Sequence, residues 1–521
     1  MLLLMLMLPM VMIPLVGLAI DGTMCFIVQA KLSAAVDGAA LGAGRLLGTN
    51  ANTTEIAGEF LNVDMPNGYW GSKNLTPTIT ATSTLNLHTI NVSATVDVPL
   101  LFLRIFGQQK SVVAAAATAT RADTRVMLVL DRSGSMNNVD AISGLNVFPT
   151  MVTSAKNFVG MFTPGTDELG MVAFDGSAIV GYPTTRPYDG SPTSATQHGP
   201  DTSFATSSTS GPMFTQINLL NSGGATNTSE ALNLAFIELQ KAHRQDLNAN
   251  GADSRLNSIV LFTDGVPTNM TVYANDPTTA NTNSLKPFGA TAGKSPCTNN
   301  PATAVAGTQM KFWMGNPGDP VSGWGTPHGL HTLSAYDNSQ TLAYWLGNGG
   351  ADKVSPNPVS SVAGCNYLNN MNWTSSANID LRQIPPFDLY GDPTNTIGYT
   401  NSFIVDATGN KIGAVYNGTS YDYLQPTNPY HTGISYWNAA DNAGKNIRGS
   451  NAAGLPVAIY TIAYSGNGGS DRGLLKRLAN TQDSTSYDPT QQSGMYVEVH
   501  SADQLNAAFS MVASELLRLA K

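Results

Sequence analysis

Charged residues are scarce in this chain of 521 residues, because Asp, Glu, Lys and Arg together make up only 12% of it. Positive charge is the scarcest, with 26 Lys and Arg against 35 Asp and Glu, and no run of basic residues occurs. A nucleic-acid-binding surface needs such a cluster to neutralise phosphates, so nucleic acid is not an expected partner. Gly, Ser, Thr and Asn are abundant instead, and a surface solvated by hydroxyls and amides suits an exported protein.

Cysteine is also rare, since three Cys are too few for a disulfide scaffold. Cys25 falls in a hydrophobic N-terminal segment, which leaves Cys297 and Cys365 as the pair that could form a bridge. Outside the cytoplasm that bridge would close a loop of about 70 residues and stabilise the fold by at most about 4 kcal/mol on chain-entropy grounds. The sequence gives no distance between the two sulfurs, so the bonded and free states both stay open.

Motifs for hydrolysis and phosphoryl transfer are missing. The sequence has no H-E-x-x-H, no G-x-S-x-G and no glycine-rich phosphate loop. Its seven His are scattered singly, apart from His328 and His331 in PHGLH. Gly and Pro make that segment a loop and no third ligand is evident, so surface histidines are the preferred interpretation. We therefore expect a binding protein and not an enzyme.

Two apolar runs that each lead to an acid are the most informative feature of the chain. Val126 to Leu130 is followed by the turn-forming stretch DRSGSM, which predicts a buried parallel strand and then a tight loop. Ile259 to Phe262 predicts a second buried strand, and it is followed by TDG. The carboxyl ends of such strands form the edge at which open α/β sheets bind ligands. The oxygen-bearing side chains in these two turns are Asp131, Ser133, Ser135 and Asp264.

A third segment supplies another hydroxyl. In GGATNTSEALNLAF, Thr226 stands just ahead of a predicted helix, because Leu232, Ala235 and Phe236 recur at helical spacing. Carboxylate and hydroxyl oxygens suit hard divalent cations, so the three segments together predict a site for Mg²⁺ or Mn²⁺. Three unrelated polar turns on one doubly wound sheet are the alternative.

In residue type and order, these three segments resemble the metal-ion-dependent adhesion site of the von Willebrand factor type A domain. GGATN has one residue more than the GGTN or GGTD usual in that family, so Thr228 is a weaker candidate for the threonine position. The resemblance implies that the serines and the threonine contact Mg²⁺, or Mn²⁺ or Ca²⁺, and that the acids act directly or through water. A partner's Asp or Glu carboxylate would complete the octahedron. The motif falls on Asp131, Ser133, Ser135, Thr226 and Asp264.

The same resemblance implies a doubly wound, Rossmann-like α/β fold, and the remaining pattern follows it. Ser501 and Gln504 form a capping box that would open the last helix. The other predicted elements are helices near 149–162, 228–241 and 437–447 and strands near 169–174, 179–182, 456–462 and 495–499.

The first 20 residues are almost wholly apolar, and a helix of that length can cross roughly 30 Å of hydrocarbon. The first basic residue is Lys31, so the basic flank of a signal or anchor is not seen. An upstream start or a processing cut ahead of residue 1 would explain this. An apolar stripe then continues, which predicts one helix of more than about forty residues. The stripe consists of Val28, Leu32, Val36, Ala39, Ala43 and Leu46.

The stretch GLAIDGTMCFIVQAKLSAAVDGAALGAGR resembles the opening of the TadE and TadG proteins of tight-adherence (Flp) pilus assembly. TadG-like members of that family carry a type A domain, as this chain does by resemblance. The basic and glycine leader and the glutamate near the mature start of many pilins are not seen, which leaves processing and filament entry open. A plain single-pass membrane anchor is the alternative.

The chain is predicted to contain four parts. They are residues 1–48, a hydrophobic and then amphipathic helix; 49–123, a small α+β pilin-like region; 124–268 with 433–521, the type A domain; and 269–432, an insertion of unassigned fold. The insertion holds four of the six Trp and leaves the metal edge of the sheet. It is therefore the candidate for a binding surface peculiar to this protein.

Two shorter segments leave alternatives open. Residues 183–212 are rich in Ser, Thr, Gly and Pro and should lie near the metal face, where they either shape ligand choice or form a flexible decoration. Asp246 to Gly251 begins like a calcium loop, but Asn257 stands where a bidentate Glu is needed, so a polar turn is preferred.

Two functions of different class follow. In the first, the chain is an adhesin whose N-terminal helix anchors it in the membrane or a Tad-like pilus, and whose type A domain binds an Asp or Glu carboxylate of a surface protein or matrix ligand. In the second, it is a structural subunit whose N-terminal helices pack with like chains in a filament and whose head is displayed. Both place the protein in a bacterial cell envelope or on its outside.

Overall fold

The computed structural model describes residues 2–44, 46–48, 51–176, 178–184, 199–273, 311–315, 330–332, 346, 388, 390–394, 429–450, 454–466 and 469–519. Cys297, Cys365, His328 and most of the predicted insertion lie outside these residues, and of His331 only the backbone is described. The chain divides into two compact units: Met1–Asp123 with Asp253–Arg255 and Leu517–Lys521, and Thr124–Ala252 with Leu256–Leu516. The division into four parts made from the sequence stays a prediction.

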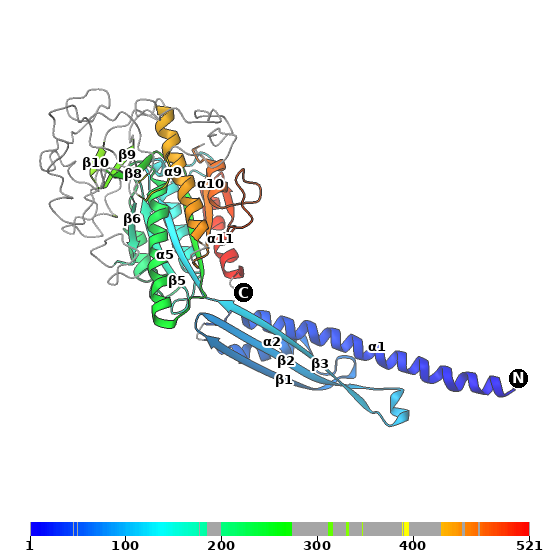
Figure 1. Cartoon of the computed structure of the whole chain (residues 1–521). Helices are drawn as coiled ribbons and strands as arrows, with labels where there is room; N and C mark the ends of the chain where they lie inside the picture. Colours follow the sequence, from blue (N-terminus) through cyan, green and yellow to red (C-terminus); the bar gives the residue numbers. More distant parts are fainter. Residues whose placement is uncertain are drawn as a thin grey trace, which may run out of the picture. The chain divides into compact units, whose positions relative to one another are not determined.

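The N-terminal unit consists of one long helix, a short helix and a three-stranded antiparallel sheet in the order β1-β2-β3 (Figure 1). The long helix has 43 residues, as the apolar pattern predicts. The elements are α1 (Leu2–Gly44), α2 (Thr53–Asp64), η1 (Tyr69–Gly71), β1 (Lys73–Thr84), β2 (Leu87–Pro99), η2 (Leu103–Phe106) and β3 (Lys110–Ala122).

The core of this unit forms where the apolar stripe of α1 meets the sheet. Every second residue of β2 from Ile90 to Val98 is buried, which is the period of a strand with one covered face. Those side chains pack with the α1 stripe from Val28 to Ala43 in one hydrophobic cluster. Leu46, predicted on the stripe, follows the end of the helix and is only half-buried, whereas Leu47 enters the core.

One helix among the described residues is long and apolar enough to cross a membrane, over Leu15–Gly44, with a mean hydropathy of 1.5. Asp21 interrupts its apolar half and is fully buried. The Asp21 carboxylate accepts backbone N–H bonds from Leu101, Phe102 and Leu103 at 2.8, 3.0 and 2.8 Å. The acid therefore ties the connection between β2 and β3 to the helix.

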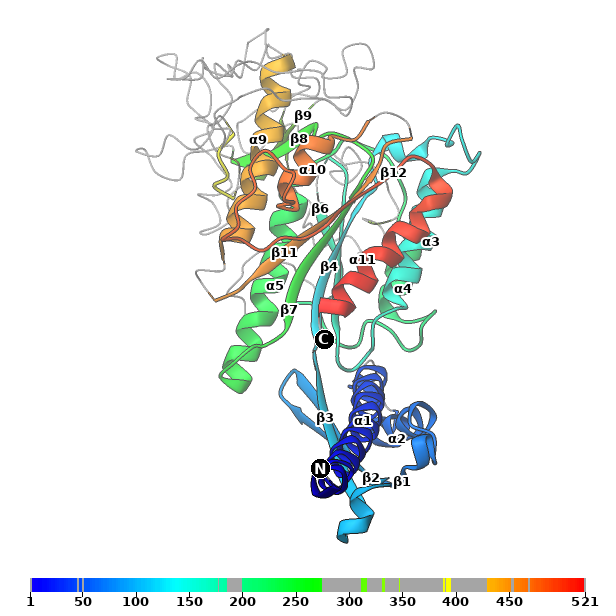
Figure 2. The same ribbon diagram turned by 90° about the vertical axis from the view of Figure 1, so that its right-hand side faces the viewer.

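The second unit is built on a six-stranded sheet in the order β12-β11-β7-β4-β5-β6 (Figure 2). All neighbouring pairs are parallel except β5 and β6, which are antiparallel. Its strands are β4 (Thr124–Asp131), β5 (Glu168–Phe174), β6 (Ala178–Tyr182), β7 (Leu256–Thr263), β11 (Val457–Tyr464) and β12 (Tyr496–Val499); a small antiparallel sheet contains β8 (Asn269–Tyr273), β9 (Lys311–Gly315) and β10 (Leu330–Thr332).

Helices cover both faces of the six-stranded sheet, as the doubly wound prediction requires (Figure 2). Met127 and Val129 of β4 pack in the cluster that contains α5, α9 and α10. On the other face, Phe158 of α3 and Phe262 of β7 both contact the ring of Phe509 in α11. The helices are α3 (Val147–Val159), α4 (Pro212–Asn218), α5 (Thr228–Asn250), α9 (Pro429–Gly449), α10 (Arg472–Leu478) and α11 (Leu505–Leu519), with short 3₁₀ turns η3 (Gly134–Asn137) and η5 (Ala502–Gln504).

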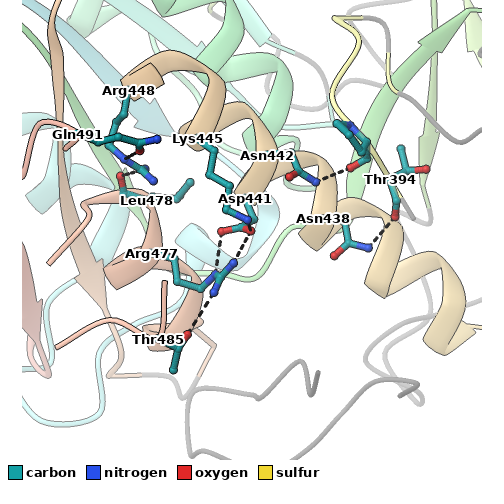
Figure 3. Close-up of polar contacts among 11 residues, drawn as sticks. Thr394, Asn438, Asp441, Asn442, Lys445, Arg448, Arg477, Leu478, Thr485 and Gln491 are labelled. Carbon is teal, nitrogen blue, oxygen red and sulfur yellow. Dashed lines mark hydrogen bonds and ion pairs between the residues drawn. The ribbon is translucent and has the colours of Figure 1, made fainter. Parts of the chain in front are cut away.

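The position of α9 is fixed by buried charge. Asp441 accepts from Arg477 of α10 at 2.8 and 2.6 Å in a bidentate pair, and Lys445 contacts the same carboxylate at 2.7 Å (Figure 3). Asp441 and Arg477 are each 1% exposed. A bidentate Arg–carboxylate pair restricts geometry, so it fixes α9 against α10.

Two local predictions are wrong. The stretch from Asp246 is neither a calcium loop nor the polar turn that was preferred, because α5 continues to Asn250 and ends on Gly251 at φ 73°. Asp246 instead accepts from buried Arg125 at 2.6 Å. The capping box also fails, since the side chain of Ser501 makes no cap bond; the last helix begins through η5.

Candidate functional site

The site lies where the strand order of the six-stranded sheet reverses. The chain leaves β4 for β5 on one side and later returns to β7 on the other side, so the carboxyl ends of β4 and β7 are neighbours at a topological switch point. Asp131 is the last residue of β4 and Asp264 directly follows β7. Ligands of doubly wound sheets bind in this position.

Two serines and one acid form the centre of the site. Ser133 Oγ and Ser135 Oγ lie 3.0 Å apart. Ser135 Oγ donates to Asp264 Oδ1 at 2.7 Å. Ser133 precedes η3 and is 1% exposed, so these oxygens belong to an ordered turn.

Asp131 is fully buried and joins the two strands below the serines. Its Oδ1 accepts the backbone N–H of Ser133 at 2.8 Å, and its Oδ2 accepts from Thr263 Oγ1 at 2.5 Å. One carboxylate thus shapes the Ser133 turn and holds the end of β7. Thr263 was not among the residues that the sequence singled out.

Thr226 and Ser135 face a common space above Gly265. A Cβ placed on Gly265 would lie 3.6 Å from Thr226 Oγ1 and 3.9 Å from Ser135 Oγ. The backbone of Thr226 is fixed on both sides, because its N–H donates to Thr268 Oγ1 at 2.9 Å and its carbonyl accepts from Thr268 N–H at 2.8 Å. Thr228, the weaker candidate, is the first residue of α5 and is buried.

Glycines join the Thr226 loop to the serine turn. Gly223 donates its N–H to the carbonyl of Arg132 at 2.8 Å, and Gly134 donates to the carbonyl of Gly224 at 2.9 Å. Gly223 and Gly224 have φ of 153° and 91°, which L side chains rarely adopt. The GG pair was visible in the sequence, but its two partners lie about ninety residues earlier and could not be inferred from spacing.

The carboxyl groups of Asp131 and Asp264 are both buried, and they repel one another when both are charged. Burial, followed by the charge of Asp131, raises the pKa of Asp264 to about 8. Burial also raises the pKa of Asp131 to about 6, against hydrogen bonds from Thr263 and Ser133. Asp264 Oδ2 is buried and has no hydrogen-bond partner among the described residues. An unpaired oxygen, two buried acids and three hydroxyls form a donor set that fits a hard divalent cation.

A second buried acid braces the loop that follows the serines. Asp140 is fully buried and accepts from Tyr464 Oη at 2.7 Å, from Ser143 N–H at 2.6 Å and from Ser501 Oγ at 3.1 Å. Although burial opposes ionisation, hydrogen bonds from the Ser143 side chain, from Tyr464 and from the backbone of Ser143 and Ala502 hold the pKa of Asp140 well below its usual value. The Ser501 hydroxyl contacts the carboxylates of Asp140 and Asp503, which explains why it does not cap the last helix.

Two regions of the chain match models of known protein families. Residues 126–266 match the model of the von Willebrand factor type A domain, so the second unit contains a type A domain. Residues 28–119 match the model for Tad-like Flp pilus assembly. The chain thus contains a type A domain and a region that matches the Tad-like Flp pilus-assembly model, and the resemblances found in the sequence are confirmed.

Solved structures with pilus functions are similar at low identity. The PilB minor pilin from Streptococcus sanguinis shares 15% identity at a TM-score of 0.34, over 87% of this chain and 80% of that chain. The vWF domain of the type V pili tip protein Mfa5 from Porphyromonas gingivalis shares 15% identity at a TM-score of 0.32, over 77% of this chain and 97% of that chain. No curated protein matches the chain in sequence.

Proposed function

We propose that this protein is a pilus-associated adhesive protein whose type A domain binds a divalent cation and, through it, a carboxylate of a surface protein or matrix ligand. The observation that carries the proposal is the unpaired, buried Oδ2 of Asp264 beside a second buried acid and a turn of hydroxyls. The match to Tad-like pilus assembly and the apolar helix α1 support a place in the bacterial cell envelope or on a pilus.

Hydroxyls would provide most of the contacts to Mg²⁺, or Mn²⁺ or Ca²⁺, at this site. Ser133, Ser135 and Thr226 are neutral donors, and the two acids contribute directly or through water. A cation bound mainly by hydroxyls keeps net positive character and an open position, and it can accept a carboxylate from a partner. This chain's own residues orient the turn and the strand ends.

Water-proton relaxation with Mn²⁺ tests both halves of this proposal on the full chain. The parent protein should bind Mn²⁺ with high relaxivity, because water occupies the open position. A capped Gly-Asp-Gly peptide at millimolar concentration should lower that relaxivity, whereas Gly-Asn-Gly should not. Asp131→Ala should abolish Mn²⁺ binding at this site.

The control replaces an acid of the same unit that lies away from the site. The side chain of Asp483 is 64% exposed and pairs with Lys476 at the surface, so Asp483→Asn should retain both the Mn²⁺ affinity and the peptide effect. Unchanged Mn²⁺ affinity in Asp131→Ala would overturn the proposal. Mn²⁺ binding without any difference between the two peptides would leave a cation site and remove the adhesive role.

A second candidate function is favoured by the N-terminal helix. Leu15, Val16, Leu18 and Phe26 of α1 are between 53 and 72% exposed. Four exposed apolar side chains on one helix can pack against lipid or against the helices of like chains. Imaging of purified fibres would separate the two functions, since a filament subunit repeats along the fibre and an adhesive tip component is rare.

A further inference from the structure

A second group of buried oxygens lies where a short segment of the predicted insertion packs on α5 and α9. Asp388 Oδ1 accepts the backbone N–H groups of Tyr390 at 2.8 Å and Asp392 at 2.9 Å, which closes a tight turn around Gly391 at φ 86°. Asp392 then accepts from Asn233 of α5 at 2.7 Å and from Asn446 of α9 at 2.5 Å. Two acids are thus presented to two helices of the type A domain.

Several oxygens at this junction have no hydrogen-bond partner among the described residues. They are Asp388 Oδ2, Ser229 Oγ and Asn438 Oδ1, which come from the turn, from α5 and from α9. Asp388 is 2% exposed, Ser229 1% and Asn438 fully buried. Burial and the charge of Asp392 raise the pKa of Asp388, while the nearby Ser229 hydroxyl lowers it. Its neighbour Asn233 bonds the other acid, so both acids meet one face of α5.

Among the described residues, the two acids have no basic partner. Within the part of the chain that the structure describes, no Lys, Arg or His forms an ion pair with Asp388 or Asp392. Two buried carboxyls this close repel one another when both are charged, and a shared proton or a bound cation relieves that repulsion. The unpaired oxygens Asp388 Oδ2 and Ser229 Oγ favour the cation, because a cation could bind both of them.

We propose that Asp388, Asp392 and Ser229 form a second divalent-cation site, and that it takes Ca²⁺. Ca²⁺ accepts six to eight oxygens in irregular geometry from carboxylates, hydroxyls and amides, whereas Mg²⁺ demands a regular octahedron. The site would join the insertion to the type A domain. Asn438 and Asn442 already donate to the carbonyls of Thr394 and Pro393 at 2.7 and 2.8 Å on the same side of α9 (Figure 3).

Calcium titration calorimetry on the full chain in detergent micelles tests the site. Asp131→Ala inactivates the adhesion-type site in this experiment, so any Ca²⁺ that binds is not bound there, and the result does not depend on the proposed function. In that background we expect one equivalent of Ca²⁺ to bind, and Asp388→Asn to remove it. Ser229→Ala, which keeps helix propensity, should weaken Ca²⁺ binding at least about tenfold. Asp483→Asn is the matched control and should change nothing.

The outcomes separate the cation from a shared proton. No Ca²⁺ bound in the Asp131→Ala background, or an unchanged equivalent in Asp388→Asn, overturns the proposal and leaves a protonated pair. If Asp388→Asn fails to fold, Ser229→Ala decides: tenfold weaker Ca²⁺ binding with an unchanged circular dichroism spectrum supports the site, and unchanged Ca²⁺ affinity refutes it.

Discussion

Asp264→Asn should make the protein more stable in EDTA and less responsive to Mg²⁺. The substitution keeps the shape of the side chain and removes the charge that Asp131 and burial oppose. With a folded-state pKa of about 8 against an ordinary 3.8, the acid must take up a proton to remain buried at pH 7. At 1.36 kcal/mol per pH unit this costs roughly 2 to 4 kcal/mol, which the amide avoids.

The stability difference between the parent and Asp264→Asn should depend on pH. A carboxyl with a raised folded-state pKa does not destabilise the fold below its unfolded pKa, and its destabilising effect grows as pH rises toward the folded value. The parent and Asp264→Asn should therefore have similar stability below about pH 4 and differ most near pH 8. Mg²⁺ at a thousandfold above Kd should stabilise the parent by about 4 kcal/mol and the variant hardly at all.

Urea unfolding, followed by Trp fluorescence at pH 4, 6 and 8 with EDTA or Mg²⁺, measures all of these differences. Asp483→Asn serves as the control and should stay within about 0.5 kcal/mol of the parent in every buffer. If Asp264→Asn is the less stable protein in EDTA at pH 8, the carboxyl supports the fold and the reasoning about a cation is refuted.

Three further predictions test separate parts of the account. Gly265→Ala should fold normally, since its Cβ would meet only ordinary contacts at 3.6 and 3.9 Å, but it should lower Mg²⁺ affinity at least about tenfold by calorimetry, because the methyl group fills the space between two donor hydroxyls. Asp21→Ala leaves three backbone N–H groups without an acceptor, so hydrogen exchange at residues 101–103 should accelerate by about a hundredfold, and unchanged exchange would contradict the role of this acid. Asp441→Asn removes the buried charge that pairs with Arg477 and should destabilise the type A domain by about 3 to 5 kcal/mol in urea unfolding. Although burial opposes ionisation, Arg477 and Lys445 lower the Asp441 pKa below 3.8, so the difference should be full at neutral pH and vanish as pH falls through that lowered value.

The strands and the long helix could be predicted because their patterns are local. The β4 and β7 runs are apolar without interruption, and each strand is buried on both faces of the sheet. The stripe of α1 repeats at helical spacing over its whole second half. Such patterns also located the ends of β4 and β7, and therefore the edge at which the candidate site lies.

Long-range polar pairs could not be predicted. The end of α5 was placed too early because its last residues are polar, yet the Asp246 bond to Arg125 joins residues 121 positions apart and extends the helix. Ser501 was expected to cap a helix, but its hydroxyl bonds Asp140, which lies 361 positions earlier. A local motif gives the chemistry of a side chain, while the fold decides which partner uses it.

Anomalous diffraction from crystals grown with Mn²⁺ tests the central claim most directly. We expect an anomalous Mn²⁺ peak at the carboxyl ends of β4 and β7, about 2 Å from the hydroxyl oxygens of Ser133 and Ser135. Thr226 and Asp264 should lie on its other sides. A crystal with Mn²⁺ elsewhere and no peak between these side chains would contradict it.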